Sequence, residues 1–234
     1  MTDSNPLSRF HSSDERSANQ AARERLAEVV RNLIVEVLGS RAADEDLSAV
    51  RETLERALAS LRDRHSDVTN GSFGVSANEQ RRQYLSRSPM FGTVNAIAAP
   101  LRITQISEGE GASVEARVIF GDPWEGPPGC VHGGFVASAF DEVLGIAQSA
   151  SGNPGMTVSL KIDYRAPTPL HKELVFRGWC DKREGRKSHT RGTLYCGETL
   201  CAEAEGLFVA IDAEIFAKLV QLRDERGQTR DSEL

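Results

Sequence analysis

The stretch 136–150 constrains the fold more than any other part of this 234-residue chain, because it is the one long helical pattern in the second half of the sequence. A helix that is apolar nearly all round is normally enclosed by other structure. The remainder of the chain is therefore predicted to wrap around it. Apolar residues recur at helical spacing and cover most of the circumference, at Phe135, Val136, Ala139, Phe140, Val143, Leu144, Ile146, Ala147 and Ala150.

Two acids, Asp141 and Glu142, interrupt this apolar surface. A carboxylate on a buried helix costs stability unless it is paired or takes part in chemistry, so Asp141 is the first candidate functional residue. His132, Gly133 and Gly134 precede the helix. Glycines leave backbone N–H groups uncovered at a helix N-terminus, where partial positive charge suits an anion or a developing oxyanion.

The spacing along the helix separates these two features. Gly134 and Asp141 share a face but stand about 10 Å apart along the axis, whereas reacting atoms must approach within about 3.5 Å. His132 and Asp141 lie on opposite sides of the helix. Both features can serve one reaction only if they come from two antiparallel copies of the helix in a homodimer. Without a dimer, one of them is structural.

The segments around the helix have the texture of strands and turns. Two β-branched stretches precede it and four follow, which predicts an α+β fold in which an antiparallel sheet of five to six strands curls around one helix. The predicted strands are 101–106, 113–120, 156–164, 173–182, 187–195 and 199–211.

The part before this domain is helical. Apolar residues at steps of three and four predict helices over 18–38 and from Asp44 to Leu61, which together form a hairpin arm. Such an arm either binds a partner or oligomerises, or it caps its own domain, and the cap is favoured because amphipathic helices usually serve packing. The predicted organisation is a disordered tail (1–17), the arm (18–64), a linker (65–88), the sheet domain (89–212) and a C-terminal helix with a tail (213–234).

Composition excludes several classes of function. A net charge of −6 and a pI near 5.5 argue against a nucleic-acid partner. No apolar run approaches the roughly 20 residues of a membrane span, and the polar N-terminus lacks the core of a signal peptide, so the protein is expected to be cytoplasmic, with its four cysteines reduced. No metal-ligand spacing, dinucleotide loop, phosphate loop or nucleophile elbow is present. Neither a metal nor a cofactor is expected.

Three stretches of the sequence together resemble a known family. They are Glu125-Gly-Pro-Pro-Gly-Cys-Val-His-Gly-Gly134 followed by Asp141, Met156-Thr157, and Tyr164-Arg-Ala-Pro-Thr-Pro-Leu170. Over about residues 90–212 they resemble the hotdog-fold acyl-CoA thioesterases, specifically the PaaI-like and thioesterase-superfamily-member group. The resemblance implies a sheet around a central helix, an acyl-CoA substrate hydrolysed to the free acid and CoA, and a homodimer with two interfacial sites, which often pairs further into a tetramer.

The resemblance also implies roles for individual residues. The Gly134 N–H would polarise the thioester carbonyl, with His132 helping to shape the site. Asp141 of the opposite subunit would act as general base or nucleophile, and Thr157 of that same subunit would position the water. One departure is Gly126, since many PaaI-like enzymes carry an Asn or Gln about six residues before the His. From the residues alone, His132 is instead a helix-entry residue that hydrogen-bonds the loop.

Other candidates concern substrate binding. Strict alternation along the strand places Thr157 on a polar face, opposite the face that carries Leu160 and Ile162. Gly133, Phe135 and Phe140 are candidates to contact substrate, and Leu144 and Trp124 are further candidates to line an acyl tunnel. Arg183, Arg186 and Lys187 surround a Gly185 turn and would hold the CoA phosphates, or else form a solvated hairpin tip. Two alternative functions remain: a non-catalytic acyl-CoA sensor or scaffold that uses the arm to bind a partner, and a hotdog hydratase.

Overall fold

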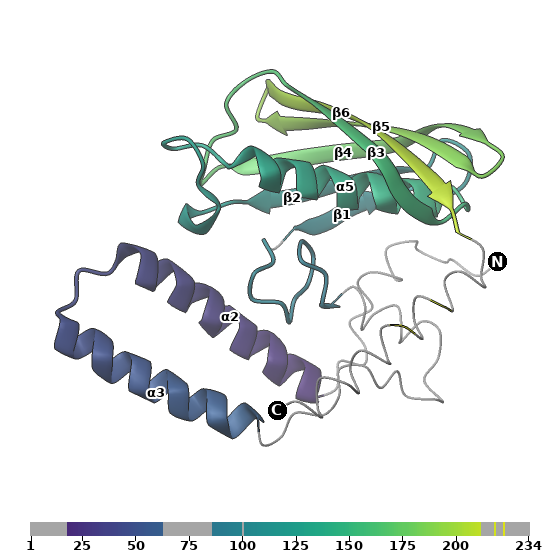
Figure 1. Cartoon of the computed structure of the whole chain (residues 1–234). Helices are drawn as coiled ribbons and strands as arrows, with labels where there is room; N and C mark the ends of the chain where they lie inside the picture. Colours follow the sequence, from purple (N-terminus) through teal and green to yellow (C-terminus); the bar gives the residue numbers. More distant parts are fainter. Residues whose placement is uncertain (1–17, 63–85, 100, 212–217, 219–221, 223–234) are drawn as a thin grey trace.

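A computed structural model of the chain describes residues 18–62, 86–99 and 101–211, together with 218 and 222 (Figure 1). The predicted tail (1–17), the linker up to residue 85 and nearly all of the predicted C-terminal helix and tail (213–234) lie outside the described residues.

The sheet domain has one helix, α5 (Gly133–Ala150), packed against a face of one antiparallel sheet (Figure 1). The sheet has six strands in the order β1-β2-β4-β5-β6-β3, so β1 and β3 form its edges. A short 3-10 helix, η2 (Asp122–Trp124), precedes α5. The predicted hotdog architecture is confirmed. The strands are β1 (Arg102–Ile106), β2 (Ser113–Ile119), β3 (Gly155–Tyr164), β4 (Glu173–Glu184), β5 (Lys187–Cys196) and β6 (Thr199–Ala210).

Three strand glycines bring α5 close to the sheet. Gly178, Gly192 and Gly206 lie on β4, β5 and β6, and a Cβ on any of them would come within 3.2 Å of a Leu144 methyl carbon. The Leu144 side chain is fully buried in this hollow. Glycine inside a strand often marks such a close approach, so these residues carried a signal that the sequence analysis did not use.

The aromatic core lies between α5 and the sheet. Phe140 is fully buried and meets Phe176 edge to face, with the ring centroids 5.0 Å apart. Leu144 is equally buried. Both residues were candidates to contact the acyl chain, but the structure places them in the core of the domain, where they hold the helix on the sheet.

The two predicted N-terminal helices are present as α2 (Ala18–Gly39) and α3 (Asp44–Arg62) (Figure 1). Helix α2 lies against η2 and the loop at residues 93–95. Arg31 donates to the Asn95 carbonyl at 3.1 Å, and Thr93 donates to Glu24 at 2.9 Å. Most of the apolar stripe of α2 is exposed, at Leu26, Val29, Val30, Val37 and Leu38, whereas Leu33 is half-buried. Helix α3 has no buried residue.

Candidate active site

His132 is the N-cap of α5. Its backbone is extended, and its Nδ1 accepts a hydrogen bond from the Gly134 N–H at 3.0 Å. In this arrangement Nδ1 is the acceptor, which leaves Nε2 as the ring nitrogen that can donate. The Phe135 ring stands edge-on to it, at a centroid distance of 6.2 Å. The helix-entry interpretation of His132 therefore describes its geometry here.

The loop before His132 is tied to itself and to the segment after β3. The Gly129 N–H donates to the Glu125 carboxylate at 2.7 Å, and the Val131 N–H donates to the Thr168 carbonyl at 2.8 Å. Gly126 is packed so tightly that a Cβ there would lie 2.7 Å from the His132 Cα. Position 126, where the resemblance would lead one to expect Asn or Gln, thus has no room for a side chain, and none assists the site from there.

Gly133 presents both of its backbone groups at the helix entrance. Tyr164 donates its hydroxyl to the Gly133 carbonyl at 2.8 Å, and a Cβ on Gly133 would lie 3.0 Å from that oxygen. The Gly133 N–H has no acceptor in the part of the chain that the structure describes. Tyr164, which had no predicted role, binds the Gly133 carbonyl and so orients the Gly133–Gly134 peptide, which carries the Gly134 N–H.

Asp141 and Thr157 form a direct pair. The Thr157 hydroxyl donates to Asp141 Oδ1 at 2.7 Å, joining the middle of α5 to the start of β3. The second carboxylate oxygen, Oδ2, has no hydrogen-bond donor among the described residues. The pair is therefore a carboxylate that is fixed in orientation and has one oxygen available to a ligand.

A β-bulge explains how Thr157 reaches the helix. Thr157 is opposite Phe208 on β6 and Ser159 is opposite Leu207, so Val158 is an extra residue in β3. A bulge shifts the alternation of side chains by one position. The prediction that Thr157 faces away from Leu160 is wrong for this reason, since Thr157, Leu160 and Ile162 all oppose β6 residues that are buried towards α5.

A cleft of about 340 Å³ opens beside Asp141. Its lining includes Asp141 of α5, Leu160 of β3 and Met90 of the loop before β1. The Ser88 hydroxyl, which anchors that loop, donates to Glu142 at 2.7 Å and accepts from the Met90 N–H at 3.1 Å. Glu142 thus holds one wall of the cleft. The lining residues are Pro89, Met90, Ala137, Ser138, Asp141, Glu142 and Leu160.

Glu142→Gln should stabilise the protein at neutral pH. Burial raises the pKa of Glu142 above its ordinary value of 4.5, opposed by the Ser88 hydrogen bond and reinforced by the charge of Asp141. A carboxyl whose pKa is raised by folding contributes its full stability below the unfolded pKa and loses it as the pH rises through the folded pKa. Glutamine can still accept from Ser88 but carries no charge.

Urea unfolding of both proteins at about pH 4 and about pH 7 measures this difference. The free energy of unfolding of Glu142→Gln should exceed that of the wild type at the higher pH, with the gap closing at the lower one. A gap of equal size at both values would contradict the assignment.

The remaining candidates lie apart from this cleft. Arg183 donates to the Ser151 carbonyl at 2.6 Å, just beyond the C-terminal end of α5, and Arg186 donates to the Ala210 carbonyl. Lys187 begins β5 beside them. The helix is about 27 Å long, so within one chain this basic cluster and the His132 end lie at opposite ends of α5.

The residues that the structure describes contain no group of three or more His, Cys, Asp or Glu suited to a metal ion. Among the helices of the described part, none has the length and apolar character to cross a bilayer.

A six-stranded antiparallel sheet around one helix, with a glycine entrance and a helix carboxylate paired to a strand threonine, defines a protein of the hotdog class. A family model described as "Thioesterase superfamily" matches residues 128–203. A crystal structure of a thioesterase superfamily protein superimposes with a TM-score of 0.69 at 30% identity, covering 83% of this chain and 92% of that one. The chain therefore belongs to the thioesterase superfamily.

Two curated relatives are similar over a shorter span. The acyl-coenzyme A thioesterase THEM4 of Bos taurus is 39% identical over 101 residues, which is 40% of each chain. The protein of the same name from Mus musculus is 37% identical over 92 residues, covering 38% of this chain and 40% of its own length. The chain therefore matches about two fifths of the length of these relatives.

Proposed function

We propose that this protein is an acyl-CoA thioesterase, which hydrolyses a fatty or aromatic acyl-CoA to the free acid and CoA. The observation that carries the proposal is the Asp141–Thr157 hydrogen bond of 2.7 Å at the edge of an open cleft. A carboxylate with one oxygen held by a hydroxyl and the other available is suited to take a proton from water. The names of the curated relatives support the same reaction class.

In the proposed reaction, water adds to the thioester carbonyl carbon while Asp141 accepts its proton. The carbon–sulfur bond then breaks, the proton held by Asp141 passes to the sulfur, and CoA leaves as the thiol while the acyl group leaves as the acid. Thr157 orients Asp141 and the water. Attack by Asp141 itself would give an anhydride that water then hydrolyses to the same products. Free-thiol release from a panel of acyl-CoA chain lengths tests the activity and separates it from a non-catalytic sensor.

The N–H groups of Gly133 and Gly134 receive the developing oxyanion in this proposal. The Gly133 N–H already lacks an acceptor within the described residues, and the Gly134 N–H would exchange His132 Nδ1 for the substrate oxygen. Loss of such a donor typically costs about 10²- to 10³-fold in rate. The positive end of the α5 dipole acts in the same direction.

A homodimer completes the site. About 10 Å of helix separates Gly134 from Asp141, so the carbonyl bound at one cannot be attacked from the other within one chain. The β3 edge strand carries exposed apolar side chains, with Met156 at 53% and Val158 at 62% exposure. Pairing of two β3 edges would cover them and bring two α5 helices together antiparallel. Two such dimers would pair to form the tetramer that the sequence resemblance implies.

Subunit complementation tests the shared site. Gly134→Pro removes an N–H in the first helical turn, where proline is tolerated, and Gly134→Ala keeps it. Asp141→Ala and Gly134→Pro should each be nearly inactive, whereas a mixture after subunit exchange should recover about a quarter of the wild-type rate. Half of the dimers are then mixed, and each has one complete site. Because Gly134→Ala keeps the N–H, its mixture with Asp141→Ala should be no more active than wild type mixed with Asp141→Ala in the same ratio. Absence of recovery after verified exchange would refute the shared site.

The basic cluster at Arg183, Arg186 and Lys187 is proposed to bind the phosphates of CoA. The three residues are exposed at the tip of the β4–β5 hairpin, where the guanidinium groups of the two arginines also bind backbone carbonyls. Arginine forks match phosphate geometry, which supports this role.

Thr157→Val should lower kcat by about 10- to 100-fold with little change in KM, because a hydrogen bond to a charged group is lost without a change of shape. Thr157→Ser keeps the hydroxyl and should retain most of the activity. The two variants are compared by steady-state thiol release on one acyl-CoA. Turnover at the wild-type level in Thr157→Val would contradict the positioning role.

A further inference from the structure

The outer helix of the arm, α3, carries an apolar seam without a buried residue. Leu47, Val50, Leu54, Leu58 and Leu61 fall on one face at steps of three or four, and each is between 37% and 52% exposed. Isolated helices of this length are marginal in water, and most helical stability in proteins comes from packing of an apolar face. A partner that packs on the seam would therefore stabilise α3.

The charges beside this seam suggest what the partner is. Asp44, Arg51, Glu55 and Arg62 lie along one side of the apolar face, at spacings of seven, four and seven residues, which keep them in register at 100° per residue. From residue 44 to residue 62 the charges are negative, positive, negative and positive. In the opposite direction they are positive, negative, positive and negative, so two antiparallel copies would place opposite charges together. Arg51 and Glu55 already pair within the helix at 2.7 Å, both well exposed.

We propose that α3 is a self-association surface, which pairs antiparallel with α3 of a second copy of this chain. Antiparallel pairing about a two-fold axis near Leu54 sets Asp44 of each copy opposite Arg62 of the other, and Arg51 opposite Glu55. The apolar seams then face each other, and the helix dipoles oppose. The contact is separate from the β3 edge and from the catalytic cleft.

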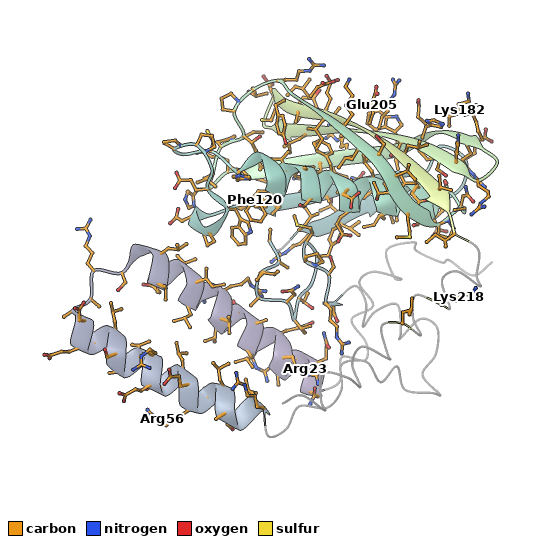
Figure 2. The ribbon with its side chains drawn as sticks, in the orientation of Figure 1. Arg23, Arg56, Phe120, Lys182, Glu205 and Lys218 are labelled. Carbon is orange, nitrogen blue, oxygen red and sulfur yellow. The ribbon has the colours of Figure 1, made fainter. Side chains whose placement is uncertain are left out.

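Figure 2 shows Arg56 on α3 pointing away from α2. Helical periodicity places Arg56 about 160° from Leu54 around the helix, on the side opposite the apolar seam. Glu52 lies on that same outer side, about 160° from Leu54 around the helix. The two sides of α3 therefore give matched positions for cross-linking, one inside the proposed interface and one outside it.

The first experiment introduces a cysteine into the full-length chain, as Leu54→Cys or Glu52→Cys, and treats each protein with a short bismaleimide. Leu54→Cys should give a covalent dimer on a denaturing gel, while Glu52→Cys and the wild type, which reports on the native cysteines, should not. No cross-linked dimer from Leu54→Cys, or equal amounts from both positions, overturns the proposal. If the chain's own C-terminal segment covered position 54 instead, Leu54→Cys would give no cross-linked dimer, and the proposal would be overturned.

The second experiment tests the charge pattern by exchange. In the Leu54→Cys background, one variant carries Asp44→Lys with Glu55→Lys, and the other carries Arg51→Glu with Arg62→Glu. Each leaves four like charges along the seam, so each alone should lose at least about 10-fold of the cross-linked dimer. A mixture of the two should regain it as a mixed dimer. Failure of the mixture to recover overturns the charge-directed pairing.

A paired substitution at Lys172 and Arg102, each to glutamate, controls for net charge outside the arm and should leave cross-linking unchanged. Acyl-CoA hydrolysis is measured on every variant in parallel. Because the seam lies outside the cleft, loss of cross-linking with hydrolysis retained supports the proposal, and its outcome is independent of whether the thioesterase assignment holds.

Discussion

Asp141→Ala should lower the turnover of acyl-CoA by at least about 100-fold while the fold and the oligomeric state persist. The carboxylate is the group that takes the proton from water, and the Thr157 hydroxyl bound to it at 2.7 Å has no catalytic partner once it is gone. Asp141→Asn keeps the shape and a hydrogen bond to Thr157 but not the basicity. It should be impaired to a similar extent.

Steady-state thiol release measures both variants, with circular dichroism and sedimentation to confirm the folded assembly. Asp181→Ala is a matched control, because Asp181 is an acid on the outer face of β4 that pairs with Arg191 at 3.4 Å, away from the cleft. It should retain wild-type turnover. Near-normal turnover by Asp141→Ala would remove the basis of the proposed mechanism.

Phe140→Ala should lower the free energy of unfolding by about 3 to 5 kcal/mol, the range for deletion of a fully buried phenylalanine. Phe140 is completely buried and packs edge to face on Phe176 at 5.0 Å. It also borders the hollow formed by Gly192, where a Cβ would meet its ring at 3.2 Å. The substitution would leave a cavity between helix and sheet that the rigid glycine row cannot fill.

Chemical denaturation compares this variant with Ile119→Ala, in which the side chain is 55% exposed and the loss should stay within about 1 kcal/mol. The two measurements also separate a core role from a tunnel role. If Phe140 lined the acyl chain instead, Phe140→Ala would shift the preferred chain length while costing little stability. A loss below about 1 kcal/mol would contradict the core assignment.

Local pattern was sufficient for the elements themselves. The apolar circumference of 136–150 predicted the central helix, and alternation with glycine turns predicted all six strands to within a few residues. The carboxylate at Asp141 and the glycine entrance could be singled out because each is locally anomalous, one as a charge on an apolar helix and the other as exposed N–H groups at its start.

Contacts between distant segments escaped that reasoning. The strict alternation assumed for β3 failed at Val158, because a bulge depends on the register with β6 and not on the residues of β3 alone. The contacts of α2 were not predicted either, since the polar Glu24 and Arg31 bind the loop at residues 93–95 while most of the apolar stripe stays exposed.

The α+β class, the order of the elements and the separation of the glycine entrance from Asp141 follow from the residues alone, because helical periodicity and rise are properties of a single segment. The inward turn of Thr157 to Asp141, the hydrogen bond from Tyr164 to the Gly133 carbonyl and the burial of Phe140 became visible only in the folded protein. These depend on strand register and on the close approach of α5 to a glycine-lined sheet. Both arise from residues that are far apart in the chain and meet only once it has folded.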